Sequence, residues 1–157
     1  MSHKGIRLLI QDAAKSLGDD IDFDFARTSD FNITASEKRY PYIVLDTPSA
    51  IPEYSVDGVT NYSKRWLCSM SFYGLDNEAS TQEEYVQILD ACDVLVDRFV
   101  NKLNFYQYSS EMNSDNILIL NINQQPFIKT TSACLTGFIL TFQVQVTDNF
   151  NYCGLGC

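Results

Sequence analysis

One long amphipathic segment constrains the fold more than any other feature of the sequence. Across residues 82–103, apolar side chains recur at three- and four-residue spacing, the period of an α-helix with one buried face. Thr81 and Glu84 have the spacing of a capping box, in which two side chains satisfy free amides at a helix start. We expect a helix packed against a core, with Asp90, Asp93 and Asp97 on its solvated side.

Alternating and continuous apolar runs predict four strands. In residues 64–74, every second side chain from Trp66 to Phe72 is apolar, and residues 135–147 alternate in the same way from Phe138 to Val146. Shorter apolar runs at 40–46 and 117–122 predict the other two strands. We expect hairpin-like antiparallel pairing of 40–46 with 64–74 and of 117–122 with 135–147, with polar connections at 104–116 and 124–133.

The N-terminal segment predicts a second helix. Apolar residues between Ile6 and Leu17 form one stripe, and Gly18 is a suitable stop because glycine adopts the left-handed cap conformation cheaply. The acidic stretch at 19–24 alternates with Ile21, Phe23 and Phe25, which is compatible with a short edge strand. It lacks the glycine and the distal glutamate of a calcium loop, so a metal site there is the weaker interpretation.

These elements predict an α+β fold with a mainly antiparallel, four-stranded sheet, two main helices on one face and a long β-hairpin arm. We expect residues 1–148 to form one domain and 149–157 to form a short C-terminal tail. At 157 residues, the chain is long enough for one hydrophobic core.

The net charge and the cysteine content exclude several classes of function and location. A net charge of −9 without a basic cluster argues against specific nucleic-acid binding. The sequence shows no secretory signal and no apolar run long enough to cross a membrane. Five scattered cysteines predict a reducing compartment rather than a disulfide framework.

Catalytic chemistry is not apparent in the sequence. The single histidine, His3, lies close to the N-terminus, which leaves no well-placed general base for a nucleophile. No glycine-rich phosphate or dinucleotide motif is present. Cys153 and Cys157 could supply half of a zinc site, but a second pair at the required spacing is missing. We therefore expect no enzyme activity, no cofactor and no metal, and the role of these two cysteines stays open.

The connection at 47–63 is longer than a hairpin needs and carries apolar and aromatic side chains. We expect it to extend as an arm that packs on a neighbouring subunit. The alternative is that it folds back over its own sheet. The residues expected to form the contact are Ile51, Tyr54, Val56 and Tyr62.

The order of elements resembles that of the tail-terminator and tail-completion proteins of bacteriophages, which form rings that join head and tail. The resemblance covers roughly residues 5–147. It is carried by the first amphipathic helix, by YPYIVLD at Tyr40 to Asp46, by TQEEYVQILDACDVLVDRF at Thr81 to Phe99 and by TGFILTFQVQVTD at Thr136 to Asp148. The tail NYCGLGC and the acidic stretch depart from the family pattern.

The resemblance implies a non-catalytic virion protein of the tail or neck, made in the host cytoplasm. Copies would form a sixfold or twelvefold ring through a sheet edge and tyrosine-rich loops. Its partners would be neck, portal or tail-tube proteins, and DNA would pass without specific contacts. Two alternatives remain: a non-catalytic cytosolic adaptor and, less favoured, a small ligand-binding domain.

Overall fold

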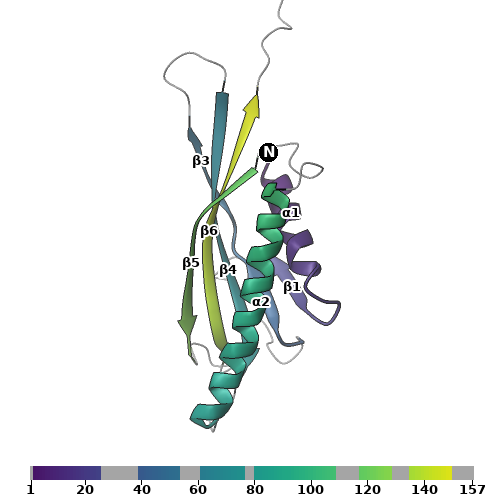
Figure 1. Ribbon diagram of the computed structural model, residues 1–157, viewed down its shortest axis with the longest axis vertical. Coiled ribbons are helices and arrows are strands. Elements are labelled where there is room, and N and C mark those ends of the chain that lie inside the picture. Colours follow the sequence, from purple (N-terminus) through teal and green to yellow (C-terminus); the bar gives the residue numbers. More distant parts are fainter. Residues whose placement is uncertain are drawn as a thin grey trace, which may run out of the picture.

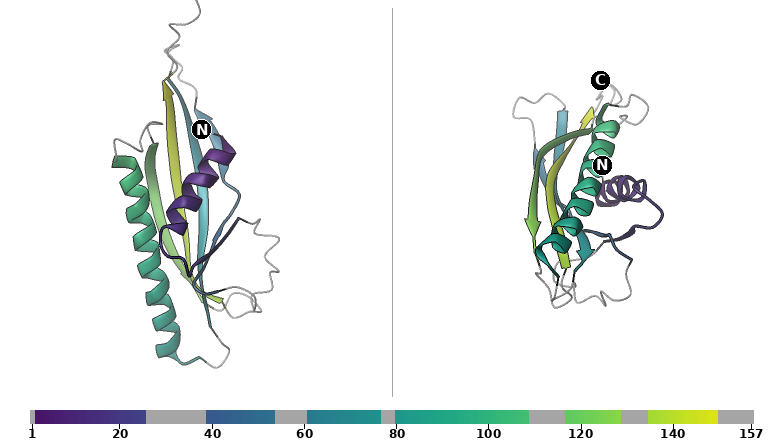
Figure 2. Two further views of the ribbon diagram at one scale, coloured as in Figure 1. Left: turned by 90° about the vertical axis from the view of Figure 1, so that its right-hand side faces the viewer. Right: turned by 60° about the horizontal axis from the view of Figure 1, so that its bottom comes forward.

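The computed structural model describes residues 2–25, 39–53, 61–76, 80–108, 117–128 and 135–149. These residues form a two-layer α+β fold, in which one sheet carries both helices on the same face (Figure 1 and Figure 2). The elements are α1 (His3–Lys15), β1 (Asp22–Phe25), β2 (Tyr42–Leu45), β3 (Ser49–Glu53), β4 (Asn61–Leu75), α2 (Gln82–Tyr108), β5 (Ile117–Phe127) and β6 (Leu135–Asn149).

The sheet has six strands, so the prediction of four was wrong. Its order is β1-β2-β4-β6-β5, and β3 also pairs with β4. The predicted antiparallel pairings of β2 with β4 and of β5 with β6 are confirmed. The extra strands are β1, which forms in the acidic stretch and runs parallel to β2, and β3, which forms inside the connection at 47–63. The sheet is therefore mostly antiparallel, with one parallel pair.

The position of β3 explains why it was missed. Leu45 lies opposite Met70 and Ser49 lies opposite Leu67, so β2 and β3 follow the same edge of β4 with one extra residue between them. That irregularity contains Pro48, and Pro52 lies in the short outer strand, where a missing amide is tolerated. Prolines and polar residues made the segment resemble a loop, although its backbone pairs with β4.

The capping box of α2 is confirmed. The backbone amide of Glu84 donates to Thr81 Oγ1 at 3.3 Å, and the amide of Thr81 donates to Glu84 Oε2 at 2.7 Å. The helix runs to Tyr108, so the loop predicted from residue 104 begins later. Tertiary contacts account for the extra turn, because Tyr106 is buried and Gln107 Oε1 accepts from the amide of Ile119 at 2.9 Å.

Two other boundaries also shift. The first helix begins after the N-cap Ser2 and ends at Lys15, before the predicted stop at Gly18. Strand β5 continues through Pro126 to Phe127, although a turn was predicted from residue 124. A register shift between Leu120 and Asn123 absorbs one residue, and the ladder with β6 then resumes. Asn121 lies in this bulge with φ 53°, a left-handed conformation that asparagine adopts more readily than most residues.

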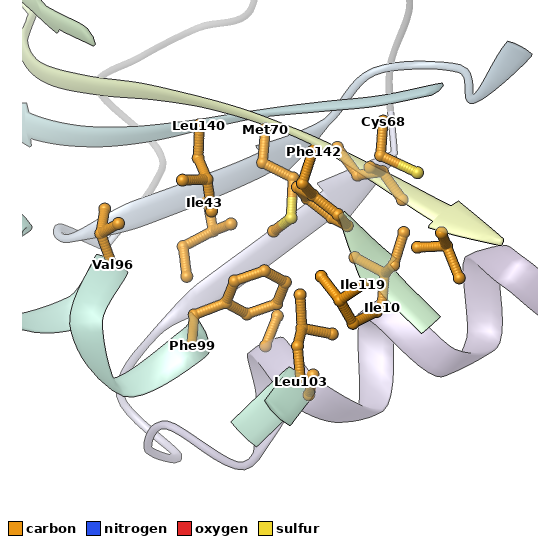
Figure 3. Packing of buried hydrophobic residues seen from close by; sticks show 14 of the residues in the cluster. Ile10, Ile43, Cys68, Met70, Val96, Phe99, Leu103, Ile119, Leu140 and Phe142 are labelled. Carbon is orange, nitrogen blue, oxygen red and sulfur yellow. The ribbon is translucent and has the colours of Figure 1, made fainter. Parts of the chain in front are cut away.

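The core lies between the helices and the sheet face beneath them. The ring of Phe99 lies 5.9 Å from that of Phe142 (Figure 3). It also lies 5.8 Å from that of Phe72, so α2 contacts both β4 and β6 through aromatic rings. Of the alternating residues predicted to share this face, Phe138 is only partly buried and packs against the core. The others are buried: Trp66, Cys68, Met70, Phe72, Leu140, Phe142, Val144 and Val146. Helix α1 adds Ile6, Ile10, Ala13 and Ala14.

Candidate assembly surface

The opposite face of the sheet carries no helix in the described part of the chain (Figure 2). We call this surface the open face and define it by the residues of the three long strands that point away from α1 and α2. Most are half-buried or exposed. They are Arg65, Leu67, Ser69, Ser71 and Tyr73 of β4, Ile139, Thr141, Gln143 and Gln145 of β6, and Leu118, Leu120, Asn121, Asn123, Gln125 and Phe127 of β5.

The open face is almost neutral. Among the residues that define it, Arg65 alone is charged, whereas the whole chain carries 20 acidic and 11 basic residues. One acidic residue outside this set, Asp46, follows β2 and lines the middle of the face. Its low content of charged side chains is a property that it shares with the core of a protein interface. Two copies with a net charge of −9 repel each other, and they do so least where their surfaces carry no charge. The open face is therefore a candidate surface for contact with another protein.

A row of aromatic rings crosses one end of the open face. The ring of Tyr73 lies 6.2 Å from Tyr42 of β2 and 5.3 Å from Phe127 of β5. Gly137 of β6 lies between Tyr73 and Phe127 in the ladder, and its lack of a side chain lets the two rings meet. The Tyr42 hydroxyl donates to Asp24 Oδ2 at 2.6 Å. Burial and this carboxylate raise the pKa of Tyr42, so the phenol stays protonated.

A shallow groove lies in the middle of the open face. Its volume is about 360 Å³, and its lining includes Asp46, Ser49, Leu67, Thr141 and Gln143. The irregularity between β2 and β3 and the bulge of β5 lie on its two sides. In the bulge, Asn121 Nδ2 donates to Gln143 Oε1 at 3.0 Å. The groove presents the Asp46 carboxylate and several hydroxyl and amide groups beside an exposed leucine.

The outer edge of β5 is partly protected against strand addition. Residues 117–128 contain no charged side chain, and exposed edges of this kind recruit other strands. However, Gln107 from α2 already accepts from the amide of Ile119, and Pro126 has no amide to offer. These two residues reduce the row of free donors, so the open face is a better candidate for contact than this edge.

The four residues predicted for the arm have different outcomes. Ile51 lies on β3 and is 47% exposed, so it is available for contact. Tyr62 has its backbone in β4, opposite Asp148. Tyr54 and Val56 lie outside the described residues, as do Cys153 and Cys157. The open face was not predicted as a contact surface, although the uncharged residues that alternate with the core residues of β4 and β6 can be read from the sequence.

The acidic stretch is engaged in internal contacts. Arg39 contacts Asp22 through both its backbone amide and its guanidinium, with Nη2 lying 2.7 Å from Oδ1. Asp24 accepts from Tyr42. Among the described residues, no three histidine, cysteine or acidic side chains are arranged to hold a metal ion.

The histidine and two of the cysteines pack against or within the core. The ring of His3 packs edge-on against Trp66 at 4.4 Å between ring centres. Burial raises the pKa of the Cys68 thiol to about 12 and that of the Cys92 thiol to about 11. Both thiols therefore stay protonated near neutral pH and are poor nucleophiles.

Comparisons with known proteins do not assign this chain to a family. No protein-family model matches its sequence, and no curated protein matches it significantly. None of the described helices is long and apolar enough to span a membrane.

Proposed function

We propose that this chain is a structural subunit of a bacteriophage virion, a tail-terminator or head–tail joining protein that works as part of a ring. The proposal rests on the resemblance in element order together with the neutral open face. It assigns the chain to the tail or neck of the particle, after synthesis in the host cytoplasm. Its partners are further copies of itself and adjoining neck, portal or tail-tube proteins.

The observation that carries the proposal is the contrast between a strongly acidic chain and its nearly neutral open face. Strands β4 and β6 have 15 residues each, so the face is roughly 50 Å long. A surface of this length and composition supports contact with a protein rather than with a small molecule. In a ring, neighbouring copies meet through two different patches, and the contact repeats until the rotation closes.

The projecting hairpin of β3 and β4 supports the prediction that an arm makes contacts in the same assembly. The ends of β3, β4 and β6 project beyond both helices at the top of Figure 1. Ile51 is exposed on this projection. We propose that the projection packs on a neighbouring subunit or an adjoining ring, where burial of the isoleucine would stabilise the contact by about 1 kcal/mol or more.

The test is to express the chain alone and with the products of its neighbouring genes, and to measure mass in solution and image the particles. We expect a closed ring, either alone or after docking on a partner. A chain that stays a single copy in every such complex would contradict the proposal. A stable one-to-one complex with a cytosolic protein, without a ring, would favour the adaptor function instead.

A further inference from the structure

Helix α2 presents a second surface, on the opposite side of the molecule from the open face. The helix has 27 residues, so it is roughly 40 Å long. Its outer side exposes apolar residues that contribute nothing to the core: Val94 and Phe105 are each 55% exposed, and Tyr108 is 79% exposed. Val86 is exposed in the same way near the start of the helix.

Charge is distributed unevenly along this helix. Its first half exposes Glu83, Glu84 and Asp90 without a basic residue. Its second half carries Arg98 and Lys102 together with one acidic residue, Asp97. The helix is therefore acidic in its first half and carries a net positive charge in its second half, with exposed apolar side chains in both.

The basic half adjoins a groove. Ser16 and Leu17, just after α1, and four residues of α2 enclose a volume of about 440 Å³. The four are Arg98, Asn101, Lys102 and Phe105. The ammonium group of Lys102 lies over the ring of Phe105, 5.2 Å from its centre, so cation and apolar surface are held together. The groove suits an acidic segment that also carries an apolar side chain.

The first half of α2 has that chemistry. Val86 is exposed between Glu83 and Asp90, which gives one apolar anchor flanked by acids. If α2 of a second copy lies antiparallel to α2 of the first, the acidic half of each helix faces the basic half of the other. A contact in which one patch meets the same patch of its partner must be self-complementary in this way.

We propose that two copies of this chain associate through an antiparallel α2–α2 contact, with the acidic first half of each helix against the Arg98 and Lys102 groove of the other. The contact is isologous and goes beyond the proposed ring, which it neither requires nor replaces. Because the helices and the open face lie on opposite sides of the sheet, both contacts can form in one assembly (Figure 2).

The test uses two charge-reversed variants of the full chain. One carries Arg98→Glu and Lys102→Glu, and the other carries Glu83→Lys and Asp90→Lys. In either variant alone, both ends of the pair would bring like charges together, so the dissociation constant should rise roughly tenfold or more. Mixed in equal amounts, one variant supplies two acidic halves and the other two basic halves, and the pair should form again.

The measurement is sedimentation of wild type, each variant and the mixture at low and high salt, with circular dichroism as the control for folding. We expect the wild-type pair to weaken as salt is added, because exposed charges are screened. Wild type that stays single at low salt, variants that pair as well as wild type, or a mixture that fails to pair would each overturn the proposal. Substitutions on the open face should leave this pairing unchanged. A failure of the α2–α2 contact can therefore be distinguished from a failure of the ring.

Discussion

The two faces of the sheet are built from the same strands but differ in what their side chains contact. On the covered face, alternate residues of β4 and β6 are buried beneath α1 and α2, and two of them, Phe72 and Phe142, contact Phe99. On the open face, the intervening residues are mostly half-buried or exposed, and nearly all are uncharged. The backbone ladder is common to both faces. The covered face therefore determines the fold, and the open face can be substituted without unfolding the chain.

The largest expected effect of a single substitution falls on the covered face. Phe99→Ala removes the ring that links α2 to β4 and β6 and should lower the free energy of unfolding by about 3–5 kcal/mol. Thr141→Ala on the open face should change it by less than about 0.5 kcal/mol, because Thr141 is exposed. Denaturant unfolding of the two variants measures both values. Equal losses would mean that the two faces do not differ as described.

Gly137 is the position on the open side of the sheet where a substitution should destabilise the fold. A Cβ added there would lie 1.8 Å from the carbonyl oxygen of Phe72, so β4 and β6 would have to move apart. We expect Gly137→Ala to cost about 1–3 kcal/mol in thermal or denaturant unfolding, by overpacking rather than by loss of contacts. If this variant is as stable as wild type, the close approach of the two strands does not constrain the sheet.

Alkaline pH tests the burial of the covered face. Because the pKa of Cys68 is raised to about 12, the folded chain keeps a proton that the unfolded chain releases above about pH 9. The unfolding free energy should therefore fall as pH rises above 9, by at most about 1.4 kcal/mol per pH unit for this thiol. Cys68→Ala should reduce the slope. An unchanged slope in that variant would show that the thiol is not buried in the native state.

Much of the covered face could be predicted from the sequence, because burial imposes a period on the chain. The alternation from Trp66 to Phe72 and the stripe of α2 both follow from contact with one core. The end of α2 at Tyr108 and the pairing of β3 could not be predicted, since each depends on partners distant in sequence: β5 contacts Gln107, and β4 holds β3. The open face gave only a weak signal, because no periodicity distinguishes a neutral contact surface from a solvated one.

The most direct test of the assembly surface is one substitution at the centre of the open face. Thr141→Arg adds a long, positively charged side chain at the centre of the open face, and Lys15→Glu on the exposed side of α1 serves as the control for a change of surface charge elsewhere. Each variant is expressed with the products of the neighbouring genes, and its incorporation into rings is measured by mass and electron microscopy. We predict that Thr141→Arg folds with a melting temperature close to that of wild type but does not enter the ring, whereas Lys15→Glu does. Normal incorporation of Thr141→Arg would contradict the assignment of the open face as the assembly surface.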